Sequence, residues 1–268
     1  MSFKRMVENG FDIVWSHVPH VSYYQIGLTV FVSFTMFISG LWLVLPVFTH
    51  YTPAFTCQGS ELGDFDQQCH STNNESKCTE FAFSFNGTGS INDDNMLTLV
   101  SSFSLVCDLA WVAPFMISIK GAVGLVGALL GSFCSDAYGR RVMLLAGCFL
   151  QTLFAVSMST MPNWWSYAIC DCFVYGIGQA LYLTATVYVC EILGPSKRHL
   201  AMISSIMFSL GYVFVSLLAW CLPKWNHLVG CVAGITGLYI PICLIMPESP
   251  QYLWVVGRVK HVFDRRSL

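Results

Sequence analysis

Residues 113–141 read APFMISIKGAVGLVGALLGSFCSDAYGRR, a long apolar run that ends in a charged turn. The hydrocarbon core of a bilayer is about 30 Å thick and is crossed by roughly 20 apolar residues in a helix. The apolar part of this stretch, 113–134, is long enough to do so. It contains a series of closely spaced glycines: Gly121, Gly124, Gly127 and Gly131. Since small residues let two helices approach closely, we expect these glycines to form a helix-packing face.

The composition excludes an ordinary soluble domain. Of the 268 residues, 55% are apolar and only 10% are charged. Soluble domains carry about 25% charged residues, because their surface has to face water. The formal net charge of −2 also argues against a nucleic-acid partner. The partner that this composition predicts is the lipid bilayer.

Stretches of the same kind recur along the chain, and each predicts one membrane-spanning helix. The predicted spans are 24–47, 113–134, 142–160, 164–190, 200–222 and 227–246. Around them lie an amino-terminal segment (1–23), a long insert (48–112) and a carboxy-terminal tail (247–268). The first span is too long for a signal peptide and follows a mixed polar lead, so we expect it to be retained. The predicted fold class is all-α, a bundle of six transmembrane helices.

The basic residues predict how the bundle is oriented. Ten of them flank the spans on one side: Lys4, Arg5, Arg140, Arg141, Lys197, Arg198, Arg258, Lys260, Arg265 and Arg266. Only Lys77 and Lys224 lie on the other side, and Lys120 lies within the second span. Because Lys and Arg are retained on the cytoplasmic side of short loops, both termini are predicted to be cytoplasmic. The insert is then extracellular or lumenal.

The insert has the features of a segment exposed to an oxidising compartment. It carries two glycosylation sequons, at Asn74 and Asn86. It also carries an even set of cysteines: Cys57, Cys69, Cys78 and Cys107. Four cysteines are compatible with two disulfide bonds in any of three pairings. Sequons and disulfides together favour the secretory route and a location in the plasma membrane.

No catalytic site is visible in the sequence, so we expect no enzymatic activity, no metal and no cofactor. There is no H-E-x-x-H motif and no glycine loop of the phosphate-binding type. Only Lys120 and Asp171 are ionisable residues clearly inside a predicted span, which makes them candidates for a functional cavity. Two alternatives are open for them. Either they form an ion pair, or Lys120 extends outward while Asp171 lines a wet cavity.

The charged turn at 132–141 carries a recognisable motif. It resembles the loop motif of the major facilitator superfamily of transporters, in which Gly, three residues, Asp, a basic residue, one residue and Gly precede two basic residues. The matching residues are Asp136, Gly139, Arg140 and Arg141. Ser132 stands where Gly is usual, and Ala137 replaces the first basic residue.

Three further stretches narrow the resemblance to the organic cation/anion transporter family of that superfamily. They are residues 52–57 (TPAFTC) after the first span, residues 105–111 (LVCDLAW) before the second, and residues 247–253 (PESPQYL) after the sixth. The large cysteine-bearing insert is also typical of the family. The resemblance covers essentially the whole chain but only the amino-terminal half of the family's expected twelve-span architecture.

The resemblance implies alternating-access transport of small organic cations, zwitterions or anions, with solute bound between two six-helix halves. It implies a cytoplasmic gate made of Asp136, Gly139, Arg140, Arg141, Glu191, Arg198 and Glu248, in which the acids pair with the arginines. Gln179 and Tyr182 are candidates for solute contact or for hydrogen bonds between helices. The family's usual Arg in the fourth span is Cys172 here, and Gln251 replaces another usual Arg.

Two functional outcomes are open for a chain of this length. In the first, a second six-helix half or self-association completes the transporter. In the second, the chain is a truncated, non-transporting accessory or binding protein.

The predicted orientation is testable on cells. An epitope placed within 48–112 should be stained on unpermeabilised cells, because the insert lies outside the cytoplasm. Tags at the two termini should be stained only after permeabilisation. Staining of the termini but not of the insert on intact cells contradicts the six-span prediction.

Overall fold

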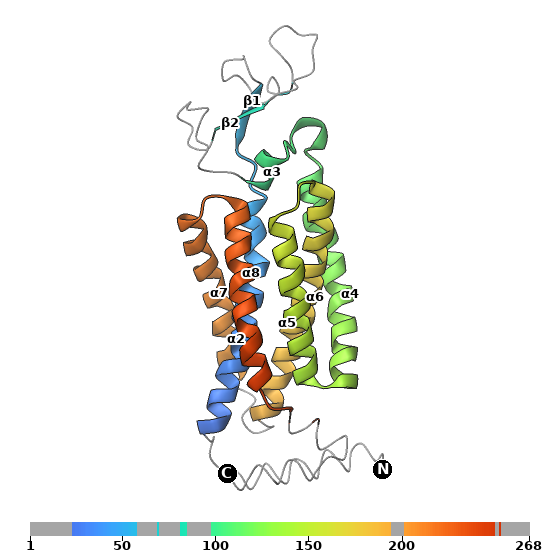
Figure 1. The fold of residues 1–268 in the computed structure, drawn as a ribbon, viewed down its shortest axis with the longest axis vertical. Coiled ribbons are helices and arrows are strands. Elements are labelled where there is room, and N and C mark those ends of the chain that lie inside the picture. The colour runs from blue at the N-terminus through green and yellow to red at the C-terminus, as the bar shows by residue number, and fades with distance from the viewer. Residues whose placement is uncertain are drawn as a thin grey trace.

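The computed structural model describes residues 23–57, 69, 81–84, 98–193, 201–249 and 252, and long helices dominate it (Figure 1). They are α2 (Tyr23–Thr49), α4 (Val112–Tyr138), α5 (Arg140–Ser159), α6 (Trp164–Leu193), α7 (Ala201–Cys221) and α8 (Trp225–Ile245). All six are long and apolar enough to cross a membrane, which confirms the predicted fold class. Each agrees with a predicted span to within a few residues. α4 and α6 extend a few residues beyond the predicted spans, into the charged sequence that follows each span. They can do so because a helix satisfies its own backbone hydrogen bonds in water as well as in lipid.

The two most extensive helix pairings indicate that the bundle is built from two sets of three helices. α2 packs along α7, and α6 packs along α4. If α2, α4 and α5 form the first set and α6, α7 and α8 the second, the first helix of each set packs against the second helix of the other. Inverted repeats produce this arrangement. α6 also contacts α5 and α2, so it is the central helix of the bundle.

Glycines bring the helix backbones into direct contact at both of these interfaces. A Cβ atom added to Gly127 of α4 would lie 2.2 Å from the carbonyl oxygen of Gly176 in α6. In the α2–α7 interface, a Cβ atom on Gly40 would lie 2.3 Å from the carbonyl oxygen of Phe208. Neither site has room for a side chain, so the interhelical distance depends on the glycines.

The glycine face predicted for α4 is confirmed at three positions and wrong at one. Gly124, Gly127 and Gly131 all lie against α6. Nothing lies within 4 Å of a Cβ atom on Gly121. At 3.6 residues per turn, Gly121 is rotated by roughly 90° from the mean direction of the other three, so it falls off the contact stripe.

Polar side chains inside the bundle bond from one helix to another. The Tyr239 hydroxyl of α8 donates to the carbonyl oxygen of Phe31 at 2.8 Å and lies 2.9 Å from Thr35 Oγ1. Trp42 Nε1 donates to Thr236 Oγ1 at 3.1 Å. Because hydrocarbon offers no water as an alternative partner, these buried groups have to be satisfied within the protein. The bonds tie α2 to α8.

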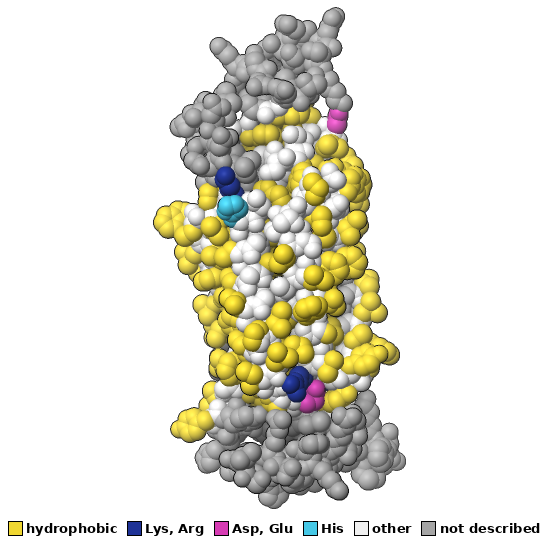
Figure 2. Space-filling model, viewed as in Figure 1, with side chains coloured by type: hydrophobic (Ala, Val, Ile, Leu, Met, Phe, Trp, Pro, Cys, Tyr) yellow, Lys and Arg dark blue, Asp and Glu magenta, His cyan; other side chains and the backbone are white. Residues whose placement is uncertain are grey.

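The outer surface is apolar along the length of the bundle. Figure 2 shows one face on which hydrophobic side chains extend over the middle, while the coloured charged side chains lie near the two ends. α7 exposes a series of large apolar side chains: Met202, Ile206, Leu210, Val213, Leu217 and Trp220. Such a continuous apolar surface is rare on soluble proteins. The chain is a multi-pass membrane protein.

One end of the bundle carries elements that the span pattern did not predict. The strands β1 (Ala54–Cys57) and β2 (Phe81–Ser84) pair antiparallel, with the first residue of one opposite the last residue of the other. A short helix, α3 (Leu99–Ser102), and a 3-10 turn, η2 (Cys107–Leu109), lead into α4. We call this end the strand end and the opposite end, where Gly139 joins α4 to α5, the turn end (Figure 1).

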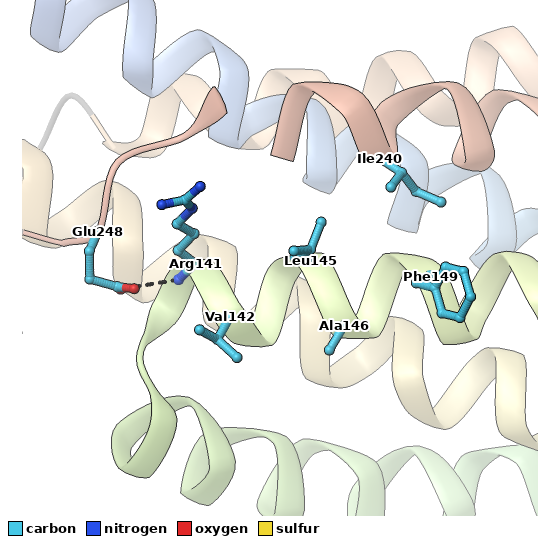
Figure 3. A pocket seen from close by; sticks show the side chains of 7 residues that line it. All are labelled: Arg141, Val142, Leu145, Ala146, Phe149, Ile240 and Glu248. Carbon is cyan, nitrogen blue, oxygen red and sulfur yellow. Dashed lines mark hydrogen bonds between the residues drawn. The ribbon is translucent and has the colours of Figure 1, made fainter. Parts of the chain in front are cut away.

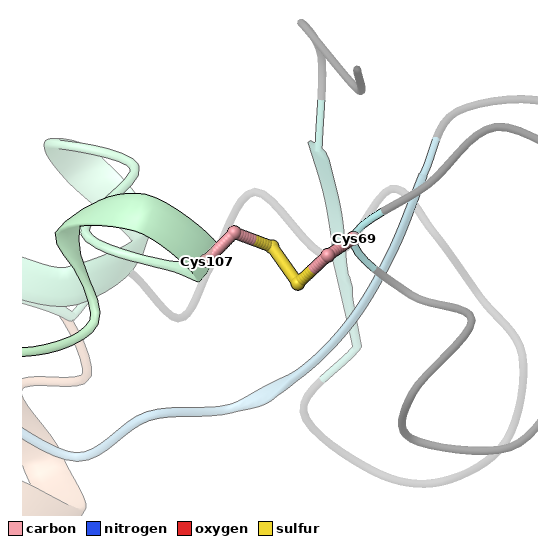
Figure 4. The surroundings of a disulfide bond; sticks show 2 residues. All are labelled: Cys69 and Cys107. Carbon is pink, nitrogen blue, oxygen red and sulfur yellow. A yellow bond between two sulfur atoms is a disulfide. The ribbon is translucent and has the colours of Figure 1, made fainter. Parts of the chain in front are cut away.

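A disulfide bond joins Cys69 to Cys107 at the strand end (Figure 4). Their Cα atoms are 5.8 Å apart, a usual separation for a disulfide. This bond excludes two of the three pairings that the sequence left open. The remaining pair, Cys57 with Cys78, involves side chains outside the described part of the chain, as do the sequons at Asn74 and Asn86, so these stay predictions.

The glycine contact between α4 and α6 generates a stability prediction. Gly127→Ala should destabilise the protein by about 1–3 kcal/mol, because the added methyl group overlaps a backbone carbonyl that cannot move alone. Gly121→Ala is the matched control on the same helix, where the methyl group meets open space, and should be neutral or slightly stabilising. Thermal unfolding in detergent measures both. Equal melting temperatures for the two variants would contradict the close contact.

Candidate functional site

The turn between α4 and α5 consists of one residue that has to be glycine. Gly139 adopts φ +103°, a conformation that side chains rarely allow. A Cβ atom there would also lie 2.9 Å from Glu248 Oε2. The motif therefore requires glycine at this position for two physical reasons: the backbone conformation and the close approach of a carboxylate.

Arg140 is the centre of the charges at the turn end. Its Nη1 lies 2.7 Å from Asp136 Oδ1 and donates to the Ser135 carbonyl oxygen at 2.8 Å. Its Nη2 donates to Glu191 Oε1 at 2.9 Å. The two acids differ in their surroundings, because the Asp136 side chain is 73% exposed and that of Glu191 only 9%. An exposed pair contributes little to stability, whereas breaking a buried one is costly, so the Arg140–Glu191 pair is the stronger link.

The segment after α8 completes this cluster. The fully buried Ser249 hydroxyl donates to Glu191 Oε2, so both oxygens of that carboxylate are bonded. Glu248 Oε1 accepts the backbone N–H groups of Arg141 at 3.1 Å and Ser249 at 3.3 Å. The Tyr188 hydroxyl donates to the carbonyl oxygen of Pro247. We call Asp136, Arg140, Glu191, Glu248 and Ser249 the turn-end cluster; it ties the start of α5, the end of α6 and the chain after α8.

The structure brings together most of the residues predicted for the gate. Arg141 differs from the prediction, because it meets Glu248 through its backbone N–H while its guanidinium donates to the Leu244 carbonyl oxygen at 2.6 Å. Arg198 lies outside the described residues. Ser249 was missed by the sequence analysis, although its place between Glu248 and a proline in the motif-bearing stretch could have suggested it.

A second group of ionisable side chains lies near the strand end, inside the bundle. Lys120 Nζ of α4 is 2.8 Å from Asp171 Oδ2 of α6, and both side chains are at least nine-tenths buried. The structure therefore contains the ion pair, the first of the two alternatives for these residues. His50, which the sequence analysis did not single out, lies with its Nε2 4.0 Å from Asp171 Oδ2.

His50 is held neutral in this group. Its Nδ1 lies 2.9 Å from Thr49 Oγ1. Burial, followed by the charge of Lys120, lowers the pKa of His50 to about 3. The neutral imidazole therefore adds no charge to the Lys120–Asp171 ion pair beside it.

Gln179 and Tyr182 lie on a half-buried face of α6, away from the Lys120–Asp171 pair. The Gln179 side chain lies beside Gly124, and the Tyr182 ring packs on Phe208 of α7 at 5.1 Å between centroids. Their spacing of three residues puts them on one side of the helix. Among the residues that the structure describes, no three His, Cys, Asp or Glu side chains gather as a metal site requires.

Comparison with known proteins identifies the family. The sequence matches the family model described as "Sugar (and other) transporter" over residues 51–267. The chain belongs to this family. Its members are membrane transporters and not enzymes, which agrees with the expectation of no catalytic site.

The similar curated proteins include transporters of organic cations. Solute carrier family 22 member 3 of Mus musculus is 29% identical over 158 residues, which are 58% of this chain and 28% of that protein. Organic cation/carnitine transporter 2 of Homo sapiens is 32% identical over 173 residues, 62% of this chain and 30% of that protein. The resemblance to the organic cation/anion transporters is confirmed. The match spans less than a third of the length of these relatives.

The solved structures that resemble this chain have the major facilitator fold. The proton:xylose symporter XylE, bound to 6-bromo-6-deoxy-D-glucose, superimposes with a TM-score of 0.61 at 15% identity, over 90% of this chain and 48% of that one. An inward-open structure of XylE from E. coli gives a TM-score of 0.54. The six helices thus have the fold of half a major facilitator transporter.

The buried ion pair generates a double-mutant prediction. Lys120→Met and Asp171→Asn should each destabilise the protein by about 3–5 kcal/mol, because each leaves one buried charge without its partner. The double variant should lose less than the sum of the two, since neither charge remains. Thermal unfolding in detergent gives the coupling. Strictly additive losses contradict a pair that acts as a unit.

Proposed function

We propose that the chain forms one half of an alternating-access transporter for small organic ions. Family membership supports a transport function, and the relatives named as organic cation and carnitine transporters support the substrate class. The half-length superposition on XylE supports the idea that a second six-helix unit faces this one across a solute site. That unit is a further half-transporter or a second copy of the chain.

The turn-end cluster is proposed as the inner gate, and the observation that carries this role is the Arg140–Glu191–Ser249 chain of bonds. It joins the start of α5, in the first three-helix set, to the end of α6 and the segment after α8, in the second set. While these bonds are made, the turn end of the half is held closed. Breaking them frees the ends of α5 and α6 to separate from the segment after α8, which is the movement an inward-opening step requires.

The two acids on Arg140 have different proposed roles. Glu191 is buried and holds the guanidinium in place, while Asp136 is exposed and exchanges with water at little cost. Gln179 and Tyr182 are proposed to face the solute from the half-exposed side of α6. Lys120 and Asp171 are buried within the half, which favours a structural role over contact with solute.

The proposed orientation puts the turn end in the cytoplasm and the strand end outside, in the plasma membrane. The distribution of basic residues supports it, and so does the Cys69–Cys107 disulfide at the strand end, because disulfides persist in oxidising compartments.

Uptake measurements test this proposal. Cells expressing the chain, alone or together with the carboxy-terminal half of a relative, should accumulate at least one member of a panel of radiolabelled organic cations and anions. Glu191→Gln should lower that uptake about tenfold or more, because the buried Arg140 loses its counter-charge. Asp136→Asn is the matched control and should have a smaller effect, since its carboxylate is exposed.

Surface biotinylation separates loss of transport from loss of protein at the membrane. Equal loss of uptake per surface molecule in Glu191→Gln and Asp136→Asn would contradict the proposed gate. Absence of uptake for every solute under both conditions would favour the alternative, an accessory or binding protein that does not transport.

A further inference from the structure

Two of the free cysteines meet inside the bundle, where α5 packs on α8. Cys148 of α5 and Cys243 of α8 are 1% and 0% exposed, and their thiols share a hydrogen bond. Cys243 also bonds with the hydroxyl of Tyr239, which is tied to α2 through its bond to the Phe31 carbonyl oxygen. The two sulfur atoms are therefore held within reach of a single third atom placed between them.

The surroundings of this thiol pair carry no charge. Beyond Arg141, α5 contains no Asp, Glu, Lys or Arg, and α8 contains none along its whole length. A group bound between the sulfurs therefore has to give an uncharged product, because a net charge in hydrocarbon is costly. It also has to be content with two protein ligands, since the described side chains offer no cluster of three His, Cys, Asp or Glu. Zinc, which takes four ligands in structural sites, does not fit.

An apolar groove lies on the outside of the same helix pair (Figure 3). Its volume is about 560 Å³, and Leu145, Phe149 and Ile240 are among the side chains that line it. Leu145 comes three residues before Cys148, an offset of about 60° around the helix. Ile240 has the same relation to Cys243. The groove and the thiol pair are thus neighbouring parts of one interface, and the groove has room for an apolar group attached to an atom between the sulfurs.

We propose that Cys148 and Cys243 form a dithiol site for trivalent arsenicals that carry one aryl group, with the aryl group in the groove. Soft sulfur ligands suit a soft acceptor such as arsenic(III). An arsenical R–As=O and the two S–H groups give one As–S bond to each cysteine and one molecule of water, which takes the arsenical oxygen and both thiol protons. No oxidant or reductant is needed, and the product is uncharged, as the site requires. The bridge joins α5 to α8, and its formation does not depend on any solute that the protein carries.

Mass spectrometry of the purified full chain in detergent tests this site, with phenylarsine oxide as the probe. A wash with excess monothiol removes arsenic that is held by a single cysteine. After this wash, the wild type should retain one equivalent more than Cys148→Ser or Cys243→Ser does. Cys231→Ser, at a half-buried cysteine of α8, is the matched control and should retain as much as the wild type. An excess of a small dithiol should release the bound arsenical.

Thermal unfolding gives a second readout for the same variants. Phenylarsine oxide should raise the melting temperature of the wild type and of Cys231→Ser, because a bridge between residues far apart in the chain restricts the unfolded state. It should leave the melting temperatures of Cys148→Ser and Cys243→Ser unchanged.

A bulky side chain in the groove tests where the aryl group lies. Ala146→Phe should slow the reaction with phenylarsine oxide about tenfold and that with methylarsine oxide much less, because only the phenyl group needs the groove. Ala122→Phe, at an exposed alanine of α4 outside the groove, is the matched control and should react like the wild type. The proposal is overturned if the wild type and the Cys148→Ser and Cys243→Ser variants retain equal amounts of arsenic, or if Ala146→Phe slows both reagents equally or neither.

Discussion

A charge in hydrocarbon has to leave the membrane or be neutralised inside it, and the positions of the ionisable side chains in this protein follow from that constraint. The described parts of α2, α7 and α8 contain no Asp, Glu, Lys or Arg. The two ionisable residues that lie well within the helices, Lys120 and Asp171, face each other at 2.8 Å. Lys120 could not extend outward to water without leaving Asp171 as a lone buried anion. The pair therefore fixes how α4 and α6 are aligned along their axes.

The turn-end cluster obeys the same constraint in a less rigid way. Arg140 has two carboxylate partners, one exposed and one buried, and Glu191 is held by both Arg140 and Ser249. A group with several partners can exchange one of them without becoming an unpaired charge. Lys120 has a single carboxylate partner among the described residues, and nearby His50 stays neutral. A conformational change is therefore cheaper at the turn end than at the strand end, which is why the gate is proposed there.

The apolar pattern was sufficient to predict the helices, and the family resemblance supplied most residues of the turn-end cluster. Apolar runs of membrane length have few alternative structures, and the Asp136–Gly139–Arg140 spacing places its members within one tight turn. Contacts between residues far apart in the chain were harder to predict. His50 approaches Asp171 only because α2 packs on α6, and Ser249 reaches Glu191 only because the segment after α8 folds back over the end of α6. No local periodicity encodes either approach. The short strands β1 and β2 were missed because a four-residue segment shows no clear alternation.

The spacing of the ionic contacts shows which parts of the half move together. α4 and α6 both run from the strand end to the turn end. Lys120 of α4 pairs with Asp171 of α6 near the strand end, whereas Glu191 at the turn end of α6 pairs with Arg140, the first residue of α5. On α6 the two pairs are 20 residues apart, from 171 to 191, which corresponds to about 30 Å of helix. Between them, Gly127 lies directly against Gly176. The ion pair and the glycine contact hold α4 and α6 in one register, whereas the Arg140–Glu191 pair joins α6 to α5 and is the contact proposed to break. In the proposed transport cycle, α4 and α6 therefore turn as one body, and the contacts that change are those at the turn end, between Arg140 and the end of α6.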